Sequence, residues 1–137
     1  KLSEVYLLAA EAALQDGHPA DAVPLINALR ERAAFRTGLS ASELATRKAA
    51  MLITQSQITL DFILNERTRE LCGESLRWPD LAMRKKLVER VKLYNPDGAP
   101  NVKDFHNLRP IPQDQINSVV DPLGDPNRNK YQNPGYY

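Results

Sequence analysis

The apolar residues at the start of the chain recur at the spacing of an α-helix. From Leu2 to Gln15 the apolar stripe consists of Leu2, Val5, Ala9, Ala12 and Ala13. Ser3 is a capping residue type at its start, and Gly17 followed by Pro19 is a stop signal at its end. We therefore predict a helix over Leu2–Gln15 that turns this stripe toward the core.

A second helix is predicted from about Ala20 to Ala33. Its apolar stripe is Val23, Ile26, Leu29 and Ala33. Asp21 lies in its first turn, where the helix dipole favours an acid. The short connection predicts an antiparallel helix hairpin. Its length and its many alanines are similar to those of a tetratricopeptide unit, although no second copy follows at that period.

Three further helical segments are predicted before residue 95. Ser42 is expected to cap the first. The second runs from about Thr59 to Gly73, and the third from Leu76 to Tyr94 with Pro79 in its first turn. The expected inward-facing residues are Leu60, Ile63, Leu64, Arg67 and Leu71 in the second segment, and Leu81, Leu87, Val88, Val91 and Leu93 in the third.

The chain changes character after Asn95, because seven of its ten prolines follow that residue. Apolar residues that need burial persist there: Phe105, Leu108, Ile111, Ile116, Val119 and Tyr131. We predict an ordered, wrapping tail with one short helix near Pro112–Ser118. The predicted fold is all-α: one domain over residues 1–137, in which a tetratricopeptide-like helix-pair bundle (1–94) is followed by a long irregular C-terminal wrap (95–137).

Charge and cysteine content limit the function classes. The 18 basic and 17 acidic residues give a formal charge of +1, which offers no electrostatic case for nucleic acid or an anionic membrane. The single cysteine, Cys72, excludes an internal disulfide and is expected to be a buried thiol. No apolar run reaches the roughly 18 residues of a membrane span. A chain that opens on Lys1 and goes directly into a helix is expected to be a piece of a longer one.

The most informative stretch is Asn65–Arg84, in which charged residues alternate with large apolar ones. Glu66, Glu70 and Glu74 are spaced i, i+4, i+8, and arginines lie between them and after them. This mixture predicts a helix-to-helix junction fixed by partly buried ion pairs. The residues assigned to this structural motif are Glu66, Arg67, Glu70, Glu74, Arg77, Trp78, Asp80 and Arg84.

A catalytic role for the same residues is less well supported than this structural one. Two carboxylates can hydrolyse a glycosidic bond, but Arg67, Arg69 and Arg77 beside the glutamates would lower their pKa values and remove the proton donor. Trp78 is interpreted as a core residue rather than a sugar-stacking surface. His18 and His106 have no partners at metal-ligand spacing, and no nucleotide-binding motif occurs. The sequence thus assigns no catalytic, metal or cofactor residue.

Four segments, in order, resemble the SusD/RagB family of nutrient-uptake lipoproteins of the bacterial outer membrane. NERTRELCGESLRWPDLAMR (65–84) is similar to the family pattern ER-x-x-EL-x-x-E-x-x-RW-x-DL-x-R. The helix pair ending in INALRERA (26–33) resembles the family's IN-x-x-R-x-RA segment. LRPIPQDQIN (108–117) resembles its PIP-x-x-E-I segment, with Gln115 in place of the acid, and YQNPGYY (131–137) its terminal QNPGY.

This resemblance implies a non-catalytic protein of the cell surface that captures oligosaccharide for import with a SusC-like TonB-dependent transporter. It also implies a membrane attachment only through a lipid anchor upstream of this chain. The family's sugar contacts come largely from loops outside the segment seen here, so no ligand-binding residue is assigned. Two alternatives stay open: a helical module that binds a peptide or partner protein, and a glycosidase fragment that uses the glutamate row.

Overall fold

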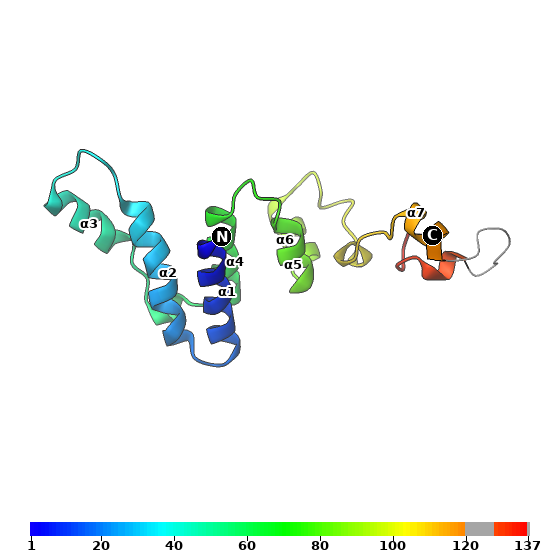
Figure 1. Ribbon diagram of the computed structural model, residues 1–137, viewed down its shortest axis with the longest axis horizontal. Helices are drawn as coiled ribbons and strands as arrows, with labels where there is room; N and C mark the ends of the chain where they lie inside the picture. Colours follow the sequence, from blue (N-terminus) through cyan, green and yellow to red (C-terminus); the bar gives the residue numbers. More distant parts are fainter. Residues whose placement is uncertain (120–127, 137) are drawn as a thin grey trace. The chain divides into compact units, whose positions relative to one another are not determined.

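A computed structural model describes residues 1–119 and 128–136, and every regular element in these ranges is helical (Figure 1). The prediction of an all-α fold is confirmed. The chain divides into two compact units, Lys1–Ser75 and Leu76–Tyr137. The change in composition after Asn95 lies within the second unit. No helix in the described ranges is long and apolar enough to cross a membrane.

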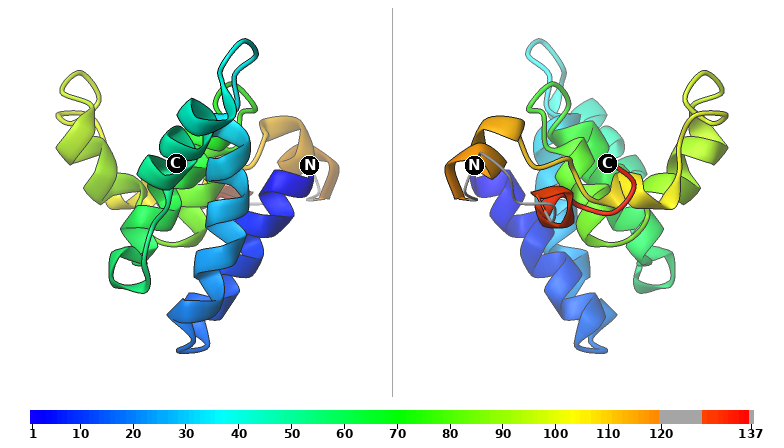
Figure 2. Two further views of the ribbon diagram at one scale, coloured as in Figure 1. Left: turned by 90° about the vertical axis from the view of Figure 1, so that its left-hand side faces the viewer. Right: turned by 90° about the vertical axis from the view of Figure 1, so that its right-hand side faces the viewer.

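The first unit is built on a hairpin of α1 (Leu2–Gln15) and α2 (Pro19–Ala34), which lie side by side in both views of Figure 2. Both helices have nearly the predicted bounds. Gly17 turns the chain at φ +81°, in the left-handed region that glycine adopts without strain. The core of this unit contains Leu7, Ala10, Ala22 and Ile26 of the hairpin together with Ile53, Ile58 and Ile63.

The side of α1 that meets this core differs from the predicted stripe. Ser3, Leu7 and Ala10 are buried, whereas Leu2 is 71% exposed and Val5 is 58% exposed. The prediction was wrong because α1 is apolar around most of its circumference, so the period alone did not identify the packed side. Ser3 does not cap the helix, since the N-cap position belongs to Lys1.

Two more α-helices complete the first unit. Helix α3 (Ala41–Met51) is capped by Ser40, not by Ser42 as predicted, because the Ser40 side chain forms a capping box with Glu43. A short 3-10 turn, η1 (Gln55–Gln57), leads to α4 (Leu60–Glu70). The Thr59 hydroxyl caps α4 by accepting a hydrogen bond from the Phe62 N–H at 3.1 Å.

Helix α4 ends at Glu70, three residues earlier than predicted. Leu71 is its C-cap, and Gly73 and Ser75 follow with φ of +81° and +60°. Cys72 lies in this turn and is exposed. The expectation of a buried thiol was wrong because the helix stops before Cys72 and the turn leaves its side chain at the surface.

The second unit begins with α5 (Arg77–Met83) and α6 (Leu87–Tyr94), where one continuous helix was predicted. Lys85 has a φ of +54°, and the Lys86 N–H donates to the Leu81 carbonyl at 2.8 Å, which closes the turn between them. The break buries Leu81, Leu87 and Val88 but leaves Leu93 65% exposed, contrary to the prediction for Leu93.

The tail forms η2 (Asp104–Asn107), α7 (Gln113–Val119) and η3 (Arg128–Tyr131). Helix α7 confirms the short helix predicted near Pro112–Ser118, and Ile116 on it is buried. Leu108 and Tyr131 were predicted to be buried and are instead about half exposed. The side chain of Val119 and the whole of Tyr137 lie outside the described part of the chain.

Candidate functional site

The glutamates of the 65–84 motif are held by arginines of α2. The Glu66 carboxylate is paired with the guanidinium groups of Arg30 on α2 and Arg69 on α4. The Arg32 Nη2 atom lies 2.5 and 2.6 Å from the two carboxylate oxygens of Glu70. Two of the recognised sequence segments, 26–33 and 65–84, are therefore joined to each other by ion pairs.

Arg30 is the centre of this arrangement and was not singled out by the sequence. Its Nη1 donates to the Met51 carbonyl at 3.0 Å, and its guanidinium carbon lies 5.2 Å from the centre of the Phe62 ring. The side chain thus holds the end of α3 and the start of α4 at once. The available signal was its place three residues after Asn27 in the 26–33 segment, which puts both side chains on one side of α2.

The protonation of Glu66 follows from this environment. Burial raises the pKa of its carboxyl, but the hydrogen bonds and charges of Arg30 and Arg69 outweigh burial, so the net pKa is below its ordinary value of 4.5. Glu66 is therefore an ionised structural carboxylate at neutral pH. A group in this state does not supply the proton that a glycosidase acid must donate.

The third glutamate is not in the predicted row. Because α4 ends at Glu70, Glu74 lies in the following turn, where its carboxylate pairs with the side-chain ammonium group of Lys1. Arg67 is buried, with a side chain only 2% exposed, and its Nη2 lies 3.9 Å from Glu4 of α1. The charges of the first half of the motif thus connect α1, α2 and α4.

The second half of the motif lies in the second unit. Asp80 is buried on α5. The Arg84 Nη1 atom lies 3.6 Å from the Asp80 Oδ1 and donates a hydrogen bond to the Asp80 backbone carbonyl at 2.9 Å. Burial lowers the pKa of Arg77, and the charge of Arg90 lowers it further, against the opposing effect of Asp80. Trp78 is half-buried, and the Arg109 guanidinium carbon lies 5.3 Å from its ring centre.

The terminal segment 131–136 is bonded to segment 108–111. The Gln132 side chain accepts a hydrogen bond from the Ile111 N–H at 2.7 Å and donates to the Ile111 carbonyl at 2.9 Å. The Tyr136 hydroxyl donates to the Leu108 carbonyl at 2.8 Å. Gly135 packs so closely on Phe105 that a Cβ there would lie closer than 3.0 Å to three atoms of the Phe105 side chain. Tyr136 is therefore an anchor of the tail.

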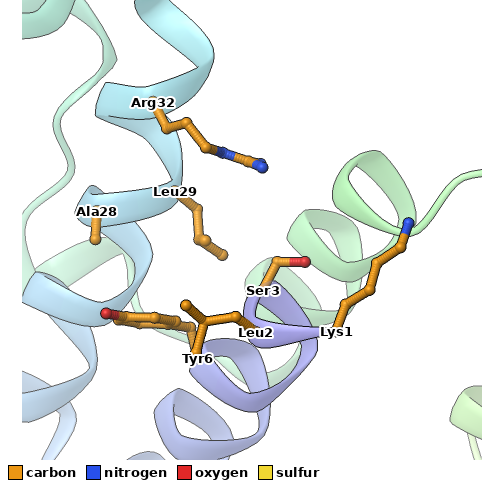
Figure 3. Close-up of a pocket in the computed structure, with 7 residues that line it drawn as sticks. All are labelled: Lys1, Leu2, Ser3, Tyr6, Ala28, Leu29 and Arg32. Carbon is orange, nitrogen blue, oxygen red and sulfur yellow. The ribbon is translucent and has the colours of Figure 1, made fainter.

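The α1–α2 hairpin carries a surface groove of about 380 Å³. Figure 3 shows its lining residues, Lys1, Leu2, Ser3 and Tyr6 from the start of α1 and Ala28, Leu29 and Arg32 from α2. The floor is apolar, and the two cations at the rim are already paired with Glu70 and Glu74. Such a groove can hold a small apolar or planar group, but it presents no acid and base for catalysis.

No group of three His, Cys, Asp or Glu side chains that could hold a metal ion occurs in the described ranges. His18 lies 3.0 Å from Asp16, and His106 accepts a hydrogen bond from the Lys103 N–H at 2.8 Å. The arrangement of charges in both units is that of a scaffold, with each motif carboxylate named above placed next to an arginine or a lysine.

Comparison with known proteins gives one consistent result. The model of the SusD family matches residues 1–136. A SusD-like protein, P38, from Formosa agariphila is 36% identical over 89 residues, which are 65% of this chain and 17% of that protein. The chain therefore matches only a small part of the length of this relative. No solved structure matches.

Proposed function

The chain belongs to the SusD family, and we propose that it forms the C-terminal part of a non-catalytic, glycan-binding nutrient-uptake protein of the outer membrane. The complete protein captures oligosaccharide at the cell surface and delivers it to a SusC-like TonB-dependent transporter. A lipid anchor upstream of this chain attaches it to the membrane. The order of the four matching segments, from the helix pair to the terminal QNPGY, supports this placement.

The observation that carries the role of this segment is the mutual pairing of its motifs. Segment 26–33 is ion-paired to Glu66 and Glu70, and segment 131–136 is hydrogen-bonded to segment 108–111. Side chains that satisfy one another in this way are not available to hydrogen-bond a sugar. We therefore assign this segment to the scaffold that positions the ligand-binding loops, which lie elsewhere in the complete protein.

A second candidate function, the binding of a peptide or partner protein, is favoured by the groove on the α1–α2 hairpin. Its apolar lining at Leu2 and Leu29 suits an aliphatic side chain of a partner, whereas Arg32 at its rim is already paired with Glu70. The two candidates differ in ligand chemistry, so one experiment can separate them.

The test is affinity electrophoresis of the complete protein encoded by the gene, and of this 137-residue chain, across a panel of soluble polysaccharides. Retardation of the complete protein alone, without release of reducing sugar, is the expected result. Retardation of neither protein by any glycan contradicts the proposal. Release of reducing sugar that disappears in Glu70→Gln, with the fold intact, contradicts the non-catalytic assignment.

If the 137-residue chain is also retarded, the binding site lies within it. Tyr6→Ala then tests the groove, and Tyr94→Ala is the matched control, since Tyr94 lies on α6 and outside the groove residues. Loss of retardation in the first variant alone would move the ligand site to the hairpin.

A further inference from the structure

The connection between α2 and α3 is an open loop on the surface of the first unit. Every residue from 35 to 40 except Leu39 is exposed, and Phe35 is 60% exposed. Gly38 has a φ of +85°, and nothing lies within 4 Å of the position of a Cβ there. We call residues 35–40 the α2–α3 loop. Exposed loop tips of small and polar residues are preferred sites of proteolytic cleavage.

Arg36 in this loop differs in position from the other basic residues of the first unit. Apart from Lys1, all the others lie within α2, α3 or α4. Arg32 of α2, for example, is held by Glu70. Arg36 is exposed, and its guanidinium forms no ion pair with any residue that the structure describes. Its side chain is therefore available to enter a pocket of another protein.

The local backbone also suits an endopeptidase. A trypsin-like enzyme holds a basic side chain against a carboxylate in its S1 pocket and cleaves the peptide bond that follows. Phe35, which precedes Arg36, has extended backbone with φ −65° and ψ 134°. The bond after Arg36 therefore lies in chain that is already outside a helix, whereas a bond within a helix is reached only after that helix opens.

We infer that the Arg36–Thr37 bond is a processing site for an endopeptidase that cleaves after arginine, and that the first unit stays assembled after the cut. Water is the co-reactant. Its oxygen bonds to the Arg36 carbonyl carbon as the bond to the Thr37 nitrogen breaks, and a proton passes to that nitrogen. A carboxylate and an ammonium group replace the amide. The inference is independent of the proposed function, because it uses only this loop and its contacts.

The hydrophobic core holds the two pieces together across the cut. Its buried residues come from both sides of the loop: Leu7, Ala10, Ala22 and Ile26 precede it, and Ile53, Ile58 and Ile63 follow it. The Asn27 side chain exchanges two hydrogen bonds with the Ile53 backbone. Beside the loop itself, the Arg47 Nε donates to the Ala34 carbonyl at 3.3 Å. Hydrolysis in the loop removes none of these contacts.

Ion pairs cross the cut as well, since Arg30 is paired with Glu66 and Arg32 with Glu70. The two new charges form at exposed positions, so neither has to be buried. The cut protein therefore keeps its fold. Once it unfolds, however, its pieces must find each other again before they can refold. A cut protein is then stable only for as long as it does not unfold.

The turns of the second unit are closed at the backbone. Lys85 and Lys86 lie between α5 and α6, but both of their N–H groups donate to carbonyls of α5, at 3.0 and 2.8 Å. The Lys103 N–H donates to the His106 Nδ1 at 2.8 Å. A protease has to open these turns before it can cleave them, so we expect cleavage there to be slower than in the α2–α3 loop.

Limited digestion of the complete protein with trypsin tests the inference. Mass spectrometry of samples taken over time identifies the new chain ends. Within residues 1–119, we expect the bond after Arg36 to be cut more than about tenfold faster than any other, because the other bonds wait for local opening. A first cut at a different bond overturns the inference. So do simultaneous cuts after Arg30, Arg47 and Arg69, because they would show that the whole unit unfolds before it is cut.

Two variants separate recognition of Arg36 from general instability. Arg36→Gln should abolish cleavage in the loop, and Lys48→Gln is the matched control, since Lys48 lies on α3 and likewise forms no ion pair with a described residue. Circular dichroism checks that both variants are folded. An Arg36→Gln protein that is cut elsewhere in residues 1–75 as fast as the wild type was cut in the loop overturns the inference.

Size-exclusion chromatography of the cut protein tests whether the unit stays assembled. The two pieces should elute together in buffer and separate in concentrated urea. Pieces that separate in buffer overturn this part of the inference. On removal of the urea, recovery of the native elution volume should fall as the cut protein is diluted and stay constant for the uncut protein. Recovery that does not depend on concentration would contradict the expected need for the two pieces to reassociate.

Discussion

Asn27 and Ile53 are joined by two hydrogen bonds, one in each direction. The Ile53 N–H donates to the Asn27 Oδ1 at 2.9 Å, and the Asn27 Nδ2 donates to the Ile53 carbonyl at 3.2 Å. A side chain on α2 thereby satisfies both backbone polar groups of the buried Ile53, which follows α3. Gln132 does the same for Ile111 in the second unit.

Replacement of Asn27 by Leu should lower the free energy of unfolding by about 2 kcal/mol, because the backbone groups of Ile53 would be left buried without partners. Urea denaturation followed by circular dichroism measures the change. Asn101→Leu is the control, since Asn101 is exposed and its side chain makes a long contact, 3.5 Å, to the Asp97 carbonyl. Equal effects of the two substitutions would contradict the importance of the pair.

Removal of the Glu66 carboxylate should destabilise the first unit strongly. Glu66→Ala leaves the largely buried Arg30 without its carboxylate partner, and such a loss costs about 3 kcal/mol. Glu89→Ala is the matched control, because the Lys86–Glu89 pair at 2.8 Å is more exposed and worth less than about 1 kcal/mol. A Glu66→Ala variant as stable as Glu89→Ala would show that the pairing with Arg30 adds little to the fold.

The same carboxylate should make stability depend on pH. The pKa of Glu66 in the folded protein is below its ordinary value of 4.5, so its contribution is fully present above about that pH and is lost as the pH falls through the folded pKa. The difference in unfolding free energy between wild type and Glu66→Gln should therefore be largest near neutrality and shrink below pH 4.5. Urea titrations from pH 7 to 3 measure it. A difference that grows toward acid pH would reverse the assigned direction of the pKa shift.

Substitution of Gly135 should release the tail. Gly135 has a φ of +90°, and a Cβ there would meet the Phe105 ring, so Gly135→Ala combines backbone strain with a clash. Gly38→Ala is the control, because Gly38 has a φ of +85° with nothing within 4 Å of an added Cβ and so isolates the strain alone. Hydrogen exchange of residues 108–111 should rise in Gly135→Ala and stay unchanged in Gly38→Ala. Equal exchange in both variants would contradict the proposal that Gly135 anchors the tail.

The thiol of Cys72 should be accessible in the folded protein. Because Cys72 is exposed in the turn after α4, one equivalent of a disulfide reagent should react without denaturant. Absorbance during the reaction gives the stoichiometry, and Cys72→Ser is the blank. A thiol that reacts only after unfolding would restore the original expectation of a buried side chain.

The sequence determined the features that depend on neighbouring residues. Helix spacing predicted α1 and α2 almost to the residue, and the turn at Gly17 and Pro19 required no distant contact. The density of prolines after Asn95 excluded a long helix there, and the short helix predicted near Pro112–Ser118 is α7. Within the 65–84 motif, spacing along the chain accounts for the pairs Glu66–Arg69 and Asp80–Arg84, because residues three or four apart lie on one side of a helix.

Only the tertiary structure decided which distant residues meet. The periodicity of α1 placed Leu2 and Val5 inside, but packing against α2 and α4 chose the side of Leu7 instead, since an almost uniformly apolar helix has no preferred side until it contacts its neighbours. The sequence places Arg67, Arg69 and Arg77 beside the glutamates, yet the Glu66 carboxylate also reaches Arg30, 36 residues earlier. Spacing along the chain fixes the direction of a side chain within its own helix, whereas the partner it meets depends on how the helices pack together.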